Sequence, residues 1–128
     1  VGVMPEFLLA KEVAHNGLTE LKVTASMHER KQVMAGMSDG FIALPGGFGT
    51  LEEFLEMVTW AQLGLHSKPC GLLNVNGYYD PLLVFLDTIV DRGLLSANNR
   101  ALFLTDSDPG TLMHRMTDHR HAVTAKWL

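Results

Sequence analysis

Hydrophobic and polar positions follow two different periods along this chain. An opening apolar stretch at residues 1–5 is followed by a helical period over residues 6–15. Residues 18–24 then alternate, with Leu21 and Val23 on one side and polar side chains on the other. This period of two is typical of a half-exposed strand. The first part of the chain therefore reads as strand, helix, strand.

The same alternation of element types continues to the end of the chain. The pattern predicts helices at residues 26–37, 50–63, 81–91 and 109–120, and strands at residues 41–44, 70–75 and 101–105. The run at 41–44 is apolar throughout, as in a strand covered on both faces. Strands that alternate with helices of this length predict an α/β fold, with a Rossmann-like open parallel sheet and helices on both faces.

Composition narrows the class of protein. A chain of 128 residues with 47% hydrophobic and 19% charged residues is expected to form one domain, residues 1–128. The net charge of −4 argues against a nucleic-acid partner or an anionic membrane surface, and no apolar run is long enough to span a bilayer. Cys70 is the single cysteine, which suits a reducing, cytoplasmic location, and its apolar surroundings favour a buried side chain over a nucleophile.

Four histidines in the second half of the chain lack neighbouring cysteine or carboxylate ligands at metal-binding spacing. They are His66, His114, His119 and His121. We expect them to be surface side chains and expect no metal site.

The segment Pro45-Gly-Gly-Phe-Gly-Thr-Leu-Glu-Glu53 is the richest in chemistry. It lies between a predicted strand and a predicted helix, a layout that presents backbone N–H groups to a phosphate. We expect its glycines, Gly46, Gly47 and Gly49, to adopt positive φ and to let a ligand approach the backbone. The dinucleotide fingerprint is absent, because Glu52 stands where its third glycine belongs, and the GK[ST] of a P-loop is absent too. The residues predict an anion-binding turn with a carboxylate beside it.

Two interpretations of Glu53 remain open at this stage. Thr50 stands where the N-cap of the following helix is expected, and Thr50-x-x-Glu53 has the spacing of a capping box. Glu53 is then either a capping residue or a group that acts on a ligand.

Two interpretations also remain open for the neighbouring cations Arg30 and Lys31. Ser26-x-x-Glu29 is another capping box, and Arg30 and Lys31 follow it in the first turns of the predicted helix. Positive charge there is unfavourable by a few tenths to ~1 kcal/mol per residue. Either an anion binds beside these cations, or both side chains extend into solvent.

The two segments together resemble a known family. Pro-Gly-Gly-x-Gly-Thr-x-x-Glu and Met27-His-Glu-Arg30-Lys31 are similar to signatures of the LONELY GUY (LOG) family, also described as lysine decarboxylases. The resemblance runs over about residues 1–95 and includes linking blocks at 59–64 and 71–79. Relatives carry an additional N-terminal βαβ segment, and we expect this chain to correspond to the C-terminal two-thirds of their fold.

The resemblance implies an enzyme. The reaction would be hydrolysis of the N-glycosidic bond of a nucleoside 5′-monophosphate, either a cytokinin riboside 5′-monophosphate or AMP, to free base and ribose 5-phosphate. Arg30 and Glu53 would be catalytic. The implied substrate contacts are Glu12, Arg30, Lys31, Gly46, Gly47, Phe48, Gly49, Thr50, Leu51, Glu52, Glu53 and Thr59. No cofactor is implied, and a pyridoxal-phosphate decarboxylation has no dedicated Schiff-base lysine, since Lys31 alone lies near the motifs.

Assembly and an alternative function complete the expectations. The predicted helix at 50–63 carries Met57, Trp60 and Leu63 beyond its core stripe, and LOG relatives are homodimers, so we expect a homodimer that buries part of this helix. The competing function is a carrier of a nucleotide or of the molybdenum cofactor without turnover. A carrier would not need both Arg30 and Glu53.

Overall fold

The computed structural model describes residues 1–9 and 15–119. The chain divides into two compact units, Val1–Ser38 and Asp39–Leu128, and each is described here by itself. Both units contain parallel strands connected through helices, which confirms the predicted α/β class. No helix among the described residues is both long and apolar enough to cross a membrane.

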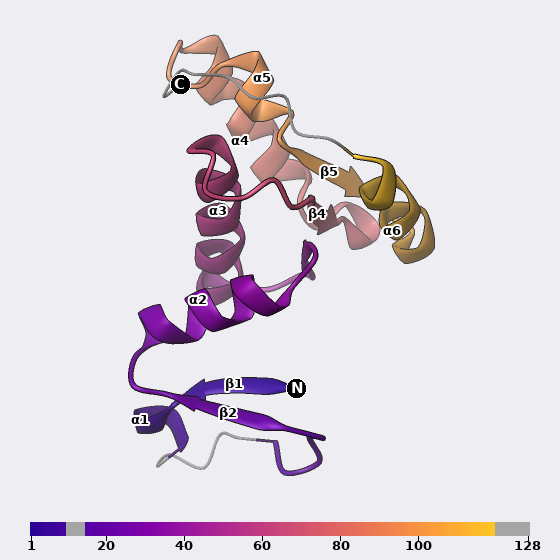
Figure 1. Ribbon diagram of the computed structural model, residues 1–128. Helices are drawn as coiled ribbons and strands as arrows, with labels where there is room; N and C mark the ends of the chain where they lie inside the picture. The colour runs from indigo at the N-terminus through magenta and orange to yellow at the C-terminus, as the bar shows by residue number, and fades with distance from the viewer. Residues whose placement is uncertain (10–14, 120–128) are drawn as a thin grey trace. The chain divides into compact units, whose positions relative to one another are not determined.

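The first unit is a two-stranded parallel sheet with a helix packed against it (Figure 1). Its elements are β1 (Gly2–Pro5), α1 (Glu6–Leu9), β2 (Leu21–Thr24) and α2 (Met27–Met37). The strands pair from Gly2 opposite Leu21 to Pro5 opposite Thr24. Of the predicted helix at 6–15, only α1 is described, because residues 10–14 lie outside the described residues.

The predicted burial pattern of β2 is wrong. Leu21 and Val23 are 38% and 50% exposed, whereas Thr24 is 4% exposed. The polar side chain is accommodated because its hydroxyl donates to the carbonyl of Ser26 at 3.1 Å, just before α2. The strand also begins three residues later than the alternation predicts.

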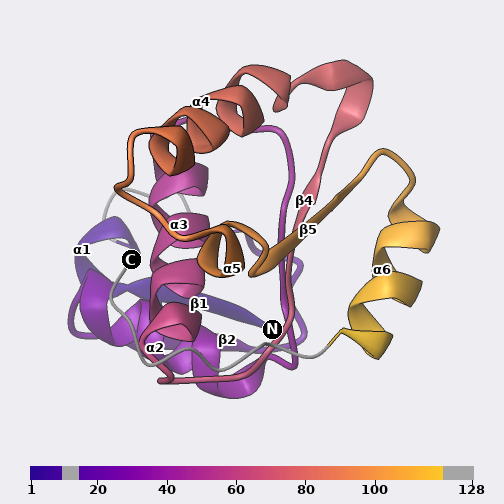
Figure 2. The same cartoon turned by 90° about the horizontal axis from the view of Figure 1, so that it is seen from above.

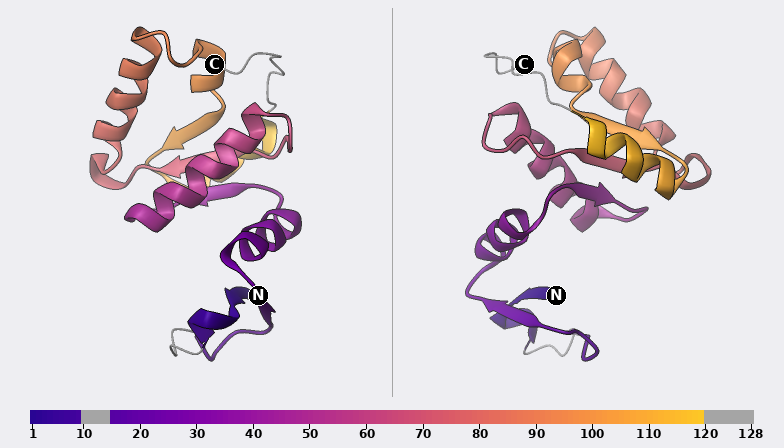
Figure 3. Two further views of the ribbon diagram at one scale, coloured as in Figure 1. Left: turned by 90° about the vertical axis from the view of Figure 1, so that its left-hand side faces the viewer. Right: turned by 45° about the vertical axis from the view of Figure 1, so that its right-hand side comes forward.

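The second unit is a three-stranded parallel sheet in the order β3-β4-β5. Its elements are β3 (Phe41–Ala43), α3 (Phe48–Gln62), β4 (Cys70–Leu73), the 3₁₀ turn η1 (Val75–Gly77), α4 (Asp80–Asp91), α5 (Ala97–Arg100), β5 (Phe103–Asp106) and α6 (Pro109–Asp118). In Figure 2, α3 and α6 lie on opposite sides of β4 and β5, and Figure 3 (right) shows α6 against β5. This unit therefore has the predicted helices on both faces of a parallel sheet.

Strand β4 is the centre of the core. Cys70 and Leu72 are 0% exposed, as the apolar composition of the strand predicts. Gly71 faces the other way, toward α6, where an added Cβ would lie 2.9 Å from Met116 Sδ and 3.0 Å from Leu112 Cδ1. Since side chains alternate along a strand, Gly71 lets α6 pack directly on the backbone of β4.

The prediction that Met57 lies beyond the core stripe of α3 is wrong. The buried residues of α3 are Phe54 and Met57. Phe54 and Met57 are three residues apart on one helix face, and Phe54 meets Phe103 of β5 edge to face at 5.4 Å. His66, in the loop after α3, is half-buried: its Nε2 lies 2.7 Å from the carbonyl of Met57, and its Nδ1 accepts from the amide of Lys68 at 3.0 Å.

The turns after β4 and α4 contain residues with positive φ, and a further helix, α5, precedes β5. Asn76 and Gly77 both have positive φ (52° and 72°), and Gly93 after α4 has a φ of 77°. The short helix α5 was not predicted, and it displaces β5 to Phe103–Asp106. Ser96 caps it by accepting from the amide of Asn99 at 3.1 Å.

We expect Gly71→Val to destabilise the protein by about 1–3 kcal/mol, because the branched side chain would overlap Leu112 and Met116 in a packed layer. Thermal unfolding measured for Gly71→Val and Gly71→Ala should show the larger loss for valine. Equal stability of wild type and Gly71→Val would contradict the packing described for α6.

We also expect Cys70 to resist thiol reagents while the protein is folded. Burial raises the pKa of Cys70 to about 12. At pH 8 the reactive thiolate is then a fraction of roughly 10⁻⁴ of the thiol. Ellman's reagent at pH 8 should detect the thiol in guanidinium chloride but not in native buffer. Rapid reaction of the native protein would show that the side chain is accessible.

Candidate functional site

The glycine turn, residues 45–49, leads from β3 into α3 without a side-chain cap. β3 ends at Ala43, Gly47 is the N-cap of α3, and no side chain accepts a capping hydrogen bond there. The first helical bond runs from the amide of Leu51 to the carbonyl of Gly47 at 3.1 Å. The amides of Phe48, Gly49 and Thr50 precede that bond, so the positive end of the helix is composed of backbone donors.

The glycines of the turn do not have the predicted backbone conformation. Among the described glycines only Gly64, Gly77 and Gly93 have positive φ, and Gly47 has a φ of −106°. Gly47 and Gly49 instead leave open space beside the backbone. A Cβ added to Gly47 or Gly49 would meet no atom within 4 Å, so the backbone at the start of the helix is bare on that side.

Gly46 has a different role within the turn. A Cβ there would overlap the side chain of Thr50, whose Oγ1 and Cβ lie directly against it. Glycine is therefore required by local packing at position 46. Phe48, two residues on, is 94% exposed.

The capping interpretation of Thr50 and Glu53 is wrong. Helix α3 begins at Phe48, so Thr50 is its third residue and Glu53 its sixth, beyond the first turn. Glu53 is four residues after Gly49 and shares its helix face, about 6 Å further along the axis. Because Cα–Cβ bonds tilt toward the helix N-terminus, the side chain of the half-buried Glu53 starts from the same face as the bare Gly49 backbone.

The remaining candidates on α3 are distributed around the helix. Glu52 is exposed and Leu51 half-buried. The hydroxyl of Thr59 donates to the carbonyl of Leu55 at 2.6 Å, and at ~100° per residue Thr59 lies ~120° around the helix from Glu53. The helix thus brings Gly49 and Glu53 to one face and places Thr59 on another.

The first unit holds Arg30 and Lys31 on α2, and its predicted cap is confirmed. The hydroxyl of Ser26 accepts from the amide of Glu29 at 3.2 Å, and the carboxylate of Glu29 accepts from the amide of Ala25 at 3.0 Å. Arg30 Nε donates to the carbonyl of Val3 at 2.8 Å, which ties α2 to β1. Lys31 is 8% exposed.

Arg30 also lines a cleft of about 580 Å³ that belongs entirely to the first unit. Most of the other lining side chains are apolar, among them Leu18, Met34 and Met37. Arg30 belongs to the first unit and Glu53 to the second, and a site shared by the two residues stays a prediction. Glu12 lies outside the described residues.

Two tyrosines that the sequence did not single out hold the glycine turn. The hydroxyl of Tyr78 donates to the carbonyl of Gly46 at 2.6 Å, and that of Tyr79 donates to the carbonyl of Leu44 at 2.5 Å. The two rings meet edge to face at 4.9 Å. Burial is the main cause that raises the pKa of Tyr79, which keeps this phenol protonated as a donor. The sequence offered one signal for this contact, namely that the tyrosines follow the strand next to β3. Loops that follow neighbouring parallel strands lie at the same edge of the sheet.

The loop that carries the tyrosines is fixed in turn by Asn74. Its side-chain oxygen accepts from the amide of Tyr79 at 2.7 Å, and its side-chain nitrogen donates to Asp80 at 2.8 Å. Its backbone amide donates to the carbonyl of Asp106, at the end of β5, at 2.9 Å.

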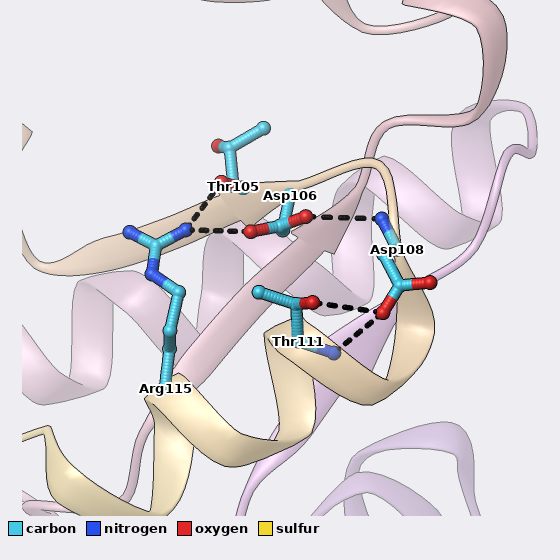
Figure 4. A network of polar contacts seen from close by, with 5 residues as sticks. All are labelled: Thr105, Asp106, Asp108, Thr111 and Arg115. Carbon is cyan, nitrogen blue, oxygen red and sulfur yellow. Dashed lines mark hydrogen bonds and ion pairs between the residues drawn. The ribbon is translucent and has the colours of Figure 1, made fainter.

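A polar network completes this edge of the sheet (Figure 4). Arg115 Nη1 donates to the carbonyl of Thr105 at 2.8 Å and to the carboxylate of Asp106 at 3.1 Å. Asp106 also accepts from the amide of Asp108, and Asp108 caps α6 by accepting from the amide and hydroxyl of Thr111. These hydrogen bonds lower the pKa of both carboxyls, so both are acceptors at neutral pH. Within the described residues, no group of three or more His, Cys, Asp or Glu side chains could hold a metal ion.

The second unit has the features of α/β proteins that bind phosphorylated ligands at the carboxyl edge of a parallel sheet. Residues 1–116 match the model of the family described as possible lysine decarboxylase. The chain belongs to this family.

Curated relatives carry names that state a reaction. A probable cytokinin riboside 5′-monophosphate phosphoribohydrolase of Oryza sativa subsp. japonica is 50% identical over 119 residues, 93% of this chain and 52% of the relative. A cytokinin riboside 5′-monophosphate phosphoribohydrolase of Arabidopsis thaliana is 47% identical over 127 residues, 98% of this chain and 60% of the relative. The chain thus spans about half to three-fifths of the length of these relatives.

The contrast between the two helix starts predicts unequal losses of stability for two similar substitutions. Ser26→Ala should cost ~1 kcal/mol of stability, because it removes the cap of α2. Thr50→Ala should change the stability little, since Thr50 lies inside α3 and caps nothing. Thermal or urea unfolding of both variants checks this, and an equal loss in Thr50→Ala would restore the capping interpretation.

Proposed function

We propose that this chain is part of an enzyme that hydrolyses the N-glycosidic bond of nucleoside 5′-monophosphates. The substrates are cytokinin riboside 5′-monophosphates or AMP, and the products are the free base and ribose 5-phosphate. The names of the relatives support this choice of reaction. The observation that carries it is the position of Glu53, on the Gly49 face of α3 and outside the cap.

The start of α3 supplies the binding part of the proposal. The amides of Phe48, Gly49 and Thr50 would receive the 5′-phosphate, as helix N-termini do for anions. The separation of about 6 Å between Gly49 and Glu53 along the axis is comparable to the distance between the 5′-phosphorus and the anomeric carbon of a nucleotide. A nucleotide bound by its phosphate would then place its anomeric carbon near the carboxylate.

The chemistry follows from the charge that develops in the reaction. As the bond between the anomeric carbon and the base nitrogen breaks, the electron pair leaves with the base and positive charge builds on the ribose. The carboxylate of Glu53 would stabilise this cation and orient the water that attacks it. The attacking water gives up one proton, and the departing base gains one. Arg30 would be the second catalytic residue, through the phosphate or the leaving base.

The proposal also includes the expected substrate contacts, absence of a cofactor, location and assembly. The substrate contacts would include Glu12, Lys31, Gly46, Gly47, Leu51, Glu52 and Thr59, with no cofactor. We propose a cytoplasmic homodimer, in which Trp60 of α3 and Leu63, its C-cap, add apolar contact area. Leu63 is 44% exposed, but Met57 is buried and is no part of this surface.

The decisive test is base release by two variants and their combination. Glu53→Gln should lower kcat by roughly 10²-fold or more with little change in Tm, because it removes the charge but keeps the shape. Arg30→Ala should also reduce turnover strongly. If both residues act in one reaction, the double variant should lose much less than the product of the single losses. Chromatography of the base released from AMP and a prenylated analogue measures each value.

Asp91→Asn provides the matched control, since it makes the same acid-to-amide change at an exposed residue, the last of α4. It should retain wild-type turnover. Full activity of Glu53→Gln would end the proposed mechanism. Tight nucleotide binding by wild type without any base release would favour a carrier.

A further inference from the structure

We infer that Tyr78 and Tyr79 are positioning residues that hold the glycine turn in its phosphate-binding shape, with Tyr78 acting mainly on substrate affinity. The inference rests on the proposed function, because it assumes that the start of α3 binds the phosphate. It concerns residues that contact the turn and not the reacting atoms.

The turn needs support from outside its own segment. The ladder of β3 ends at Ala43, and Pro45 has no N–H to donate. The next backbone bond described along the segment is that from Leu51 to Gly47, inside α3. The phenols of Tyr78 and Tyr79 reach across from more than 30 residues away and bind the carbonyls on either side of Pro45.

The two hydrogen bonds also orient the turn electrostatically. Carbonyl oxygens repel an anion, and these two carbonyls are each engaged by a phenol. The amides that follow them, at Phe48, Gly49 and Thr50, point along the helix axis toward its N-terminus, where an anion is attracted. Fixing the carbonyls therefore fixes the direction of the donors.

The two rings differ in burial, and therefore in what their removal would change. Tyr79 is 3% exposed and packs in the core, so its removal would affect folding as well as the turn. Tyr78 is 51% exposed, and its hydroxyl contacts the residue directly before the N-cap of α3. An exposed ring adds little to the core, so the hydrogen bond to Gly46 is the contribution of Tyr78 that a phenylalanine would lose.

Tyr78→Phe keeps the ring and removes this hydrogen bond alone. We expect it to raise the Kd for ribose 5-phosphate and the KM for AMP by about fivefold, as befits one lost hydrogen bond that preorganises the donors. We expect kcat to stay within about twofold, because the phosphate is bound alike in ground state and transition state. Tm should change little. Titration calorimetry with ribose 5-phosphate and steady-state base release measure the two constants.

Thr88→Val is the control, since it removes another hydroxyl-to-carbonyl hydrogen bond, from Thr88 to Val84 at 3.1 Å on α4, away from the turn. It should leave both constants unchanged. An unchanged Kd in Tyr78→Phe would overturn the inference, as would equal increases in Tyr78→Phe and Thr88→Val. Calorimetry measures binding even if the wild-type protein releases no base. In that case the hydrolase proposal fails, but weaker binding of ribose 5-phosphate by Tyr78→Phe than by wild type would still support the positioning role.

Discussion

The hydrogen bonds from Tyr78 to Gly46 and from Tyr79 to Leu44 are the constraint on which the candidate site depends. A glycine-rich segment loses more conformational entropy on ordering than any other. Here the strand before it is three residues long, and the helix after it has no side-chain cap. Contacts from the loop after the neighbouring strand supply the order that the segment lacks.

That loop is in turn fixed to the third strand. Asn74 connects the tyrosine loop to Asp106, and Asp106 is held by Arg115 and by the cap of α6 (Figure 4). The carboxyl ends of β3, β4 and β5 are thus connected by side-chain and backbone hydrogen bonds in one series. A binding site needs such a rigid support, because small displacements of donors reduce their effect on a bound charge.

The sequence predicted the elements well where local signals and tertiary contacts agree. The parallel α/β class, the Ser26 cap and the buried Cys70 were all correct. Ser26-x-x-Glu29 and Thr50-x-x-Glu53 are the same local pattern, yet only the first is a cap. At the second, Gly46 gives Thr50 a packing site and Gly47 serves as the N-cap, so the helix starts two residues earlier.

Contacts between distant residues account for most of what the sequence did not reveal. The role of His66 comes from its hydrogen bond to Met57, and the tyrosines act through carbonyls that every residue possesses. No pattern of side chains along the chain marks which carbonyl will be bound. The exposed Leu21 and Val23 similarly show that alternation defines two faces of a strand without defining which one is covered.

The electrostatics of the proposed reaction explain why a glycine turn and one carboxylate are insufficient for it. A phosphate charge and Glu53 about 6 Å apart repel by about 3 kcal/mol per unit charge at an effective dielectric constant of 20. The N-terminus of α3 offers only about half a positive charge in return, and the chain as a whole carries a net charge of −4. Binding the nucleotide while keeping Glu53 ionised therefore requires additional cations. Arg30 and Lys31, whose charges are unfavourable at the start of α2, meet this requirement in the proposed mechanism.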